Sequence, residues 1–240
     1  MALVGSHAVK PFVLPVNRGT GLIDANEVRG NDNALRTAYV AHDADSTIHI
    51  QSGTLASRPA TADAGTTWIA TDTQDTYCYL SGAWVQIGWA HWYGDFYDTT
   101  DQAVTTANTA QLITLNSTGI TRGTSRTNGS RVNVSYAGDY NIMFSVQLKN
   151  ASADEQDAYL WLKKNNTNIA ESAGRVTIPK KHGSEDGHTI AAWNIYTTLA
   201  ANDYVELYVQ ASSTDVAVET IAAAGSVPRS PSVILTINRI

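Results

Sequence analysis

The turn HGSEDGH at residues 182–188 is the densest group of histidines and carboxylates in this 240-residue chain. His182, Glu185, Asp186 and His188 offer the nitrogen and oxygen ligands that zinc and other transition metals accept. The segment is short and glycine-flanked and lies between two predicted strands, so we interpret it as a solvated loop. We therefore predict no metal site and no cofactor.

Two further kinds of chemistry lack the residues that they need. Asp43 and Asp45 have the spacing at which a calcium-binding loop begins. Such a loop requires glycine at its sixth position and glutamate at its twelfth, where this chain has Ile48 and Thr54. The patterns G-x-S-x-G, G-x-x-x-x-G-K-[ST] and H-E-x-x-H of nucleophilic, phosphoryl-transfer and zinc-dependent enzymes are missing as well. We predict that the protein is not an enzyme.

Aromatic residues gather in the segment GWAHWYGDFY, residues 88–97, beside His91 and Asp95. Flat rings near a carboxylate suit stacking on sugars, so Trp89, Trp92 and Tyr93 are candidate glycan-binding residues. The alternative is that these rings pack where two parts of the chain join, or on a trimer axis. We favour packing.

The composition is typical of an all-β protein, because Thr, Val, Ile, Tyr and Trp are plentiful and only 16% of residues are charged. A formal net charge of -6 provides no basic field for phosphates, so we expect no nucleic-acid partner. Cys78 is the only cysteine, which excludes an internal disulfide. We find neither a secretory signal nor a membrane-spanning run, and we expect synthesis in a cytoplasm and no membrane partner.

The N-terminal part of the chain divides in two. Residues 1–22 are predicted to form an extended arm, because Pro11 and Pro15 interrupt regular structure among apolar residues. Residues 23–57 are predicted to be a helix and a linker, with the helix over about residues 25–42.

The remainder of the chain shows the period of two that is typical of strands. Residues 58–90 are predicted to form a small β-meander with a turn at Ser81-Gly82. In residues 91–240 apolar and polar residues alternate most clearly in GDYNIMFSVQL, residues 138–148. Several such strands with no helix between them predict an antiparallel β-sandwich.

Large aromatic residues occupy strand positions opposite the predicted core. They are Tyr159, Trp161, Tyr196, Tyr204 and Tyr208. Outward-facing Tyr and Trp side chains are typical of an oligomer interface, so we predict a trimer interface at these positions. The alternative is that loops cover some of them.

The C-terminal segments resemble the trimeric jelly rolls of the tumour necrosis factor and complement type. The resemblance rests on AGDYNIMFSVQL (137–148), YLWLKKN (159–165), AAWNIYTTLAANDYVELYVQ (191–210) and SVILTI (232–237). That family has a G-D-x-V-x-L turn, and Asn202 stands here in place of its glycine. Over about residues 94–240 the resemblance implies a jelly roll and a homotrimer.

A second resemblance concerns RPATADAGTTWIATDT (58–73) and GAWV (82–85). These segments are similar to linker modules of tailed-bacteriophage fibres, spikes and decoration proteins, which implies a virion structural protein made in a bacterial host. Because the chain is short for a fibre, we expect a homotrimeric decoration or cement protein on the outer head surface, bound to the major capsid protein. The expected capsid-anchoring residues are Phe12, Val13, Leu14 and Val16. The alternative is a tail fibre or spike that binds host-surface glycan.

Overall fold

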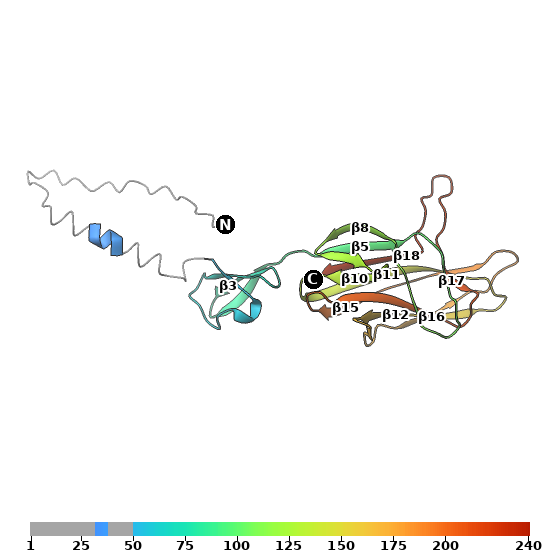
Figure 1. The fold of residues 1–240 in the computed structure, drawn as a ribbon, viewed down its shortest axis with the longest axis horizontal. Helices are drawn as coiled ribbons and strands as arrows, with labels where there is room; N and C mark the ends of the chain where they lie inside the picture. The colour runs from blue at the N-terminus through green and yellow to red at the C-terminus, as the bar shows by residue number, and fades with distance from the viewer. Residues whose placement is uncertain (1–31, 38–49) are drawn as a thin grey trace, which may run out of the picture. The chain divides into compact units, whose positions relative to one another are not determined.

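The computed structural model of the chain describes residues 32–37 and 50–240. Residues 32–37 are helical and form part of the predicted helix at 25–42. The rest of that helix, the predicted arm at 1–22 with its four anchoring residues, and Asp43 and Asp45 lie outside the described residues. From residue 50 onward nearly all regular structure is β, which confirms the predicted mainly-β fold class (Figure 1).

A small sheet of four strands, in the order β1-β2-β3-β4, forms the first module of this part of the chain. Its elements are β1 (Gln51–Gly53), the 3-10 helix η1 (Leu55–Ser57), β2 (Thr67–Ala70), β3 (Asp75–Leu80) and β4 (Ala83–Gly88). Strands β2, β3 and β4 are antiparallel neighbours, as a meander requires. Ser81 and Gly82 make the predicted turn with φ of 51° and 84°. The parallel strand β1 adds an edge that the sequence pattern does not predict.

Two larger sheets form the second module. The β11 sheet comprises β5 (Tyr93–Asp98), β6 (Gln102–Ala103), β8 (Ser117–Arg122), β11 (Gly138–Asn150), β15 (Gly187–Leu199), β17 (Val216–Val218) and β18 (Val233–Arg239). The β16 sheet comprises β7 (Gln111–Leu112), β9 (Thr124–Thr127), β10 (Arg131–Val134), β12 (Gln156–Lys164), β13 (Thr167–Asn168), β14 (Gly174–Ile178) and β16 (Tyr204–Ala211). Buried side chains from both sheets form one continuous core, so the module is the predicted antiparallel sandwich.

The eight principal strands pair in a nested order. The first, β5, pairs with the last, β18, and the second, β10, pairs with the seventh, β16. Inside these pairs, β11 pairs with β15 and β12 pairs with β14. A long antiparallel ribbon that is rolled up on itself produces this nesting, which defines a jelly roll. The strand pairing itself therefore confirms the predicted fold.

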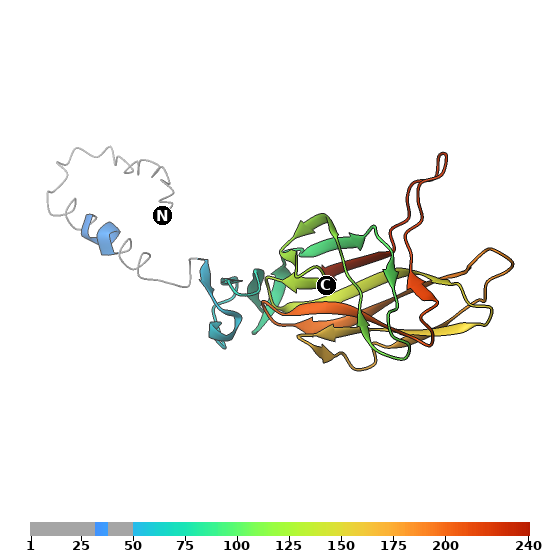
Figure 2. The same ribbon diagram turned by 45° about the vertical axis from the view of Figure 1, so that its right-hand side comes forward.

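A ribbon at residues 219–232 interrupts the last strand of the jelly roll. Strands β17 and β18 pair with consecutive stretches of the same edge of β11, so they lie end to end. Between them the chain leaves the sheet, and backbone bonds join Ile221 to Ser230 and Ala224 to Val227. The ribbon projects clear of the sandwich (Figures 1 and 2).

The sandwich core is filled by the inward side chains of the predicted strands. In β11 the residues Tyr140, Ile142, Phe144, Val146 and Leu148 are all buried, as their alternation predicts. The hydroxyl of Tyr140 donates a hydrogen bond to the backbone oxygen of Tyr136 at 2.8 Å. Burial raises the pKa of Tyr140 to about 12, so the side chain stays neutral and keeps this bond at physiological pH.

Arg239, at the end of β18, joins the jelly roll to the small sheet. Its Nη2 donates to Oδ2 of Asp75 at 2.7 Å, and its Nη1 donates to the backbone oxygen of Thr73 at 2.8 Å. Both charged side chains are almost completely buried. Gly138 lies against the arginine, where an added Cβ would come within 2.3 Å of its Nε. The two modules are thus held together by a desolvated ion pair in a site shaped for arginine.

Replacing Arg239 with methionine should lower the free energy of unfolding by about 3–5 kcal/mol, because the carboxylate of Asp75 would stay buried without a partner. Urea denaturation followed by circular dichroism measures this loss. Arg175→Met is the control, since it removes the exposed pair with Asp157 and should hardly move the midpoint. Equal losses in the two variants would contradict a special role for the junction.

Candidate functional site

The polar residues of the 182–188 turn pair with one another and with neighbouring strands. The backbone groups of His182 and Glu185 bond to each other at 2.8 and 3.2 Å, which closes a tight turn. Nδ1 of His188 lies 3.2 Å from Glu219, whose other carboxylate oxygen lies 3.0 Å from Nζ of Lys149. This hydrogen bond to Glu219 raises the pKa of Lys149. Within residues 32–37 and 50–240 no group of three or more His, Cys, Asp or Glu side chains is arranged to hold a metal ion.

The aromatic run at residues 88–97 is divided between the core and the surface. Trp92 is only 8% exposed and stacks on Tyr136, with ring centroids 4.3 Å apart and planes 12° apart. The guanidinium of Arg122 lies 5.3 Å from the same ring, and a Cβ on Gly123 would come within 2.5 Å of it. Trp92 therefore packs inside the jelly roll, and little of its ring is exposed.

The other two candidate glycan-binding residues keep exposed surface. Trp89 is 53% exposed and meets only the edge of His91, at 5.7 Å between ring centroids. Tyr93 is also partly exposed. These two rings are the part of the run that could meet a sugar.

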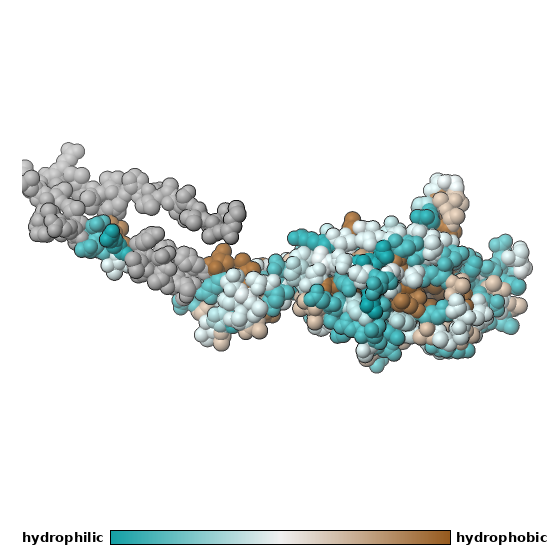
Figure 3. Space-filling view, viewed as in Figure 1, coloured by the Kyte–Doolittle hydropathy of each residue, from teal (hydrophilic) through white to brown (hydrophobic). Residues whose placement is uncertain are grey.

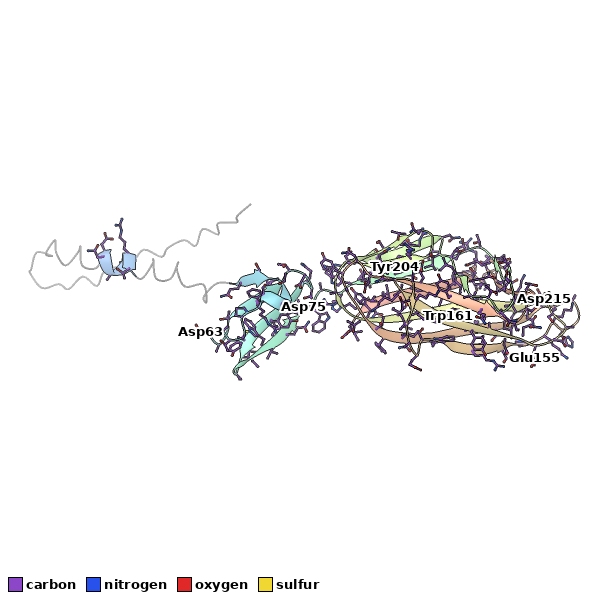
Figure 4. All side chains as sticks on the ribbon, turned by 60° about the horizontal axis from the view of Figure 1, so that its bottom comes forward. Asp63, Asp75, Glu155, Trp161, Tyr204 and Asp215 are labelled. Atoms are coloured by element: carbon purple, nitrogen blue, oxygen red, sulfur yellow. The ribbon has the colours of Figure 1, made fainter. Side chains whose placement is uncertain are left out.

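Four of the five outward aromatic residues lie on the outer face of the β16 sheet, in a charged setting. Figure 4 labels two of them, Trp161 and Tyr204. The guanidinium of Arg131 lies 4.3 Å from the ring of Tyr204, and Nζ of Lys163 lies 4.0 Å from the ring of Tyr208. Trp161 stacks on Tyr208 at 5.8 Å. Burial raises the pKa of Tyr208. Basic side chains thus cover much of the aromatic surface here.

Ionised groups continue across this face of the β16 sheet. Arg131 pairs with the buried carboxylate of Glu206 at 3.2 Å, and Arg175 pairs with Asp157 at 2.6 Å. Tyr159 lies between these pairs and is the most exposed aromatic residue of the face. We name this surface the charged face. Oppositely charged side chains of this face therefore pair with each other at its surface.

The fifth aromatic residue, Tyr196, lies on the other sheet. Its position on β15 faces outward beside Asn141 of β11, with which it is in register. The sequence pattern correctly places all five aromatic residues opposite the core, but it does not show that they belong to two separate faces. The sheet that carries Tyr196 has a different outer surface.

The outer surface of β11, β15 and β18 carries no charged side chain between Asp139 and Lys149 of β11. We name it the uncharged face, and its residues are Asn141, Met143, Ser145, Gln147, Ile190, Ala192, Asn194, Tyr196, Ile234, Thr236 and Asn238. Met143, Ile190, Tyr196 and Ile234 are 37% to 62% exposed. Small and amide side chains fill the space between them. Asp95 of β5 flanks the face on one side.

An uncharged band with protruding Met, Ile and Tyr side chains has the composition of an interface core, where charge is depleted and aromatic residues and methionine are enriched. Sequence reasoning missed this face because most of its residues are neither large nor aromatic. The sequence does contain a signal for this face. The outward positions of residues 141–147 and 190–196 contain no Lys, Arg, Asp or Glu.

Comparison with known proteins yields structural matches only. No protein-family model matches the chain, and no curated protein matches it. Among solved structures, the chain is similar to two crystal structures of murine APRIL, determined at pH 8.0 and pH 8.5. They are 12% and 11% identical in sequence, have TM-scores of 0.41 and 0.39, and match 63% of this chain and 100% of theirs. Over the residues that the structure describes, no helix is long and apolar enough to cross a membrane.

Trp92→Ala should lower the free energy of unfolding by about 3–5 kcal/mol, because it opens a cavity beside Tyr136. Trp89→Ala, three residues earlier, should leave the melting temperature unchanged because its ring is exposed. Thermal unfolding of both variants by circular dichroism tests the assignment. A stable Trp92→Ala variant would show that the ring does not pack.

Proposed function

We propose that this chain is a structural protein of a tailed-bacteriophage particle, which assembles as a homotrimer and decorates the outer surface of the head. The uncharged face of the β11 sheet is the observation that carries the proposal. It gives the jelly roll one surface suited to permanent burial, whereas the charged face on the opposite side of the sandwich is suited to water.

The uncharged face supports self-association because burial there costs little. Transfer of an ionised group out of water is expensive, and none stands between Asp139 and Lys149. The amides and hydroxyls of the face can hydrogen-bond to the same groups of another copy. The four protruding side chains provide the apolar area. A jelly roll that joins two others through this face places them around a common axis.

The charged face is a poor place for the same contact. Closing it against a partner would desolvate four ionised side chains that still reach water, and ion pairs that are already formed in water would add little to the contact. These side chains are Arg131, Asp157, Lys163 and Arg175, whereas the carboxylate of Glu206 is already buried. The proposed trimer interface is therefore the uncharged face with Tyr196. In this proposal the charged face stays in contact with solvent, together with its aromatic residues Tyr159, Trp161, Tyr204 and Tyr208.

The likeness of residues 58–73 and 82–85 to phage linker modules supports the virion part of the proposal. For a head location, the proposed anchors across neighbouring capsid subunits are Phe12, Val13, Leu14 and Val16, which are apolar side chains in the sequence. Three arms on one trimer bind together, so weak individual contacts add through effective concentration. The major capsid protein is the proposed partner.

Tyr196→Asp should dissociate the trimer into monomers, because it places a carboxylate in the centre of the buried face. Tyr159→Asp is the matched control on the charged face and should remain trimeric. Light scattering coupled to gel filtration measures the mass of each variant. A monomeric Tyr159→Asp and a trimeric Tyr196→Asp would move the interface to the charged face, and a monomeric unmodified chain would reject the homotrimer.

Gold-labelled antibody against residues 94–240 should mark the heads of intact particles in electron microscopy. Particles assembled with a chain that lacks residues 1–22 should carry no gold, because the proposed anchor is gone. Gold at the tail would instead support the runner-up, a tail fibre or spike that binds host glycan, for which exposed Trp89 and Tyr93 are the remaining sugar-stacking surface. Unlabelled particles would reject a virion role.

A further inference from the structure

The small sheet has one face that the chain covers and one that its described residues leave open. On the covered side, Arg58 lies over the ring of Tyr77 at 4.2 Å and over that of Trp84 at 5.4 Å. Nε1 of Trp84 donates to the backbone oxygen of Pro59 at 2.7 Å. The loop between η1 and β2 thus closes this side, and Trp68 is buried beneath it.

The opposite side is an open aliphatic face, formed by Ile69, Leu80, Val85 and Ile87. The strand register places Thr67 of β2, Cys78 of β3 and Val85 of β4 in one row on this side. Alternation adds Ile69, Thr76 and Leu80 to it. Asp75 is the one charged residue of β1 to β4, and it faces the covered side together with Tyr77. Figure 3 shows hydrophobic residues at the surface of this module.

The aliphatic face is a contiguous apolar surface that is too small to hold a free partner by itself. Its four side chains are 36% to 54% exposed. Together they present apolar area on the order of 300 Å², in the range of patches that mark interaction sites. A stable complex of two free proteins buries about 800 Å² on each partner. The occupant of this face must therefore be brought to it by some other contact.

A second copy of the same module meets that condition, provided that the chain forms the proposed homotrimer. Arg239 and Asp75 hold each small sheet to its jelly roll, so three joined jelly rolls carry three small sheets close together. The small sheets of one trimer would have a high effective concentration for each other, so even a weak contact between them would form. Two copies of this face can also pack against each other, because the contact would bury aliphatic side chains and no unpaired charged group.

We propose that the aliphatic faces of the small sheets pack against one another around the trimer axis, as a second interface that depends on the first. This gives the module a role beyond that of a spacer. It extends the proposed trimer contact from the jelly roll to the small sheet.

Cysteine crosslinking in the full-length protein tests the proposal. In a Cys78→Ser background, V85C places a thiol on the aliphatic face, and Q86C places one at the next residue, exposed on the covered side. A short bis-maleimide should join V85C chains to each other about tenfold faster than Q86C chains, after each rate is divided by labelling with a monofunctional maleimide. Native Cys78, on the aliphatic face, provides a second reading without any substitution.

Light scattering of the same samples separates the two ways in which the idea can fail. A trimer in which V85C and Cys78 crosslink no faster than Q86C overturns the second interface and leaves the homotrimer standing. This outcome includes a face that residues 1–49 of the same chain shield. A monomeric chain overturns the homotrimer and the second interface together. Rapid crosslinking of V85C within a trimer supports both.

Discussion

The ion pair between Arg239 and Asp75 is the contact on which the arrangement of the two modules depends. Strand β18 lies between β11 and β5, so its last residue is fixed by the centre of the β11 sheet. From there the guanidinium reaches a carboxylate and a backbone oxygen of the small sheet in two directions. Because the planar guanidinium of Arg239 is held at two points, it restricts both the rotation of the two modules and the distance between them. A buried ion pair adds little net stability compared with apolar packing, and its clearer effect is to specify one geometry.

The two outer faces of the sandwich show that aromatic content alone does not identify an interface. On the β16 sheet, Tyr204 and Tyr208 lie under Arg131 and Lys163, whose charged ends remain in water. On the uncharged face of β11, β15 and β18, Tyr196 lies among amides, hydroxyls and aliphatic side chains. What separates the faces is the cost of removing water, which ionised groups raise and small neutral groups do not. The proposed homotrimer follows from that difference.

Much of the fold could be predicted from the sequence, because alternation over a long strand leaves little choice. The pattern in residues 138–148 predicts β11 and its buried side chains, and the Ser81-Gly82 turn predicts a hairpin. Short strands such as β1 and β10 give too few alternations to be recognised. Period two also shows which side chains point inward, but not which sheet a strand joins, so Tyr196 could not be separated from the other four aromatic residues. The partners Arg239 and Asp75 are 164 residues apart, and no local pattern connects them.

The same reasoning applies to attachment of the proposed trimer to a particle, which in this proposal rests on several contacts and on no large single interface. The uncharged face and the aliphatic face are each modest surfaces, and each would bind weakly on its own. In the proposed trimer, association of the jelly rolls makes the contact between the aliphatic faces intramolecular. Once one arm is bound to the capsid, the other two arms of the same trimer bind without a further loss of translational freedom. In this proposal the contact between the small sheets depends on the junction at Arg239, because a small sheet that moved freely would lose the effective concentration that its own contact requires.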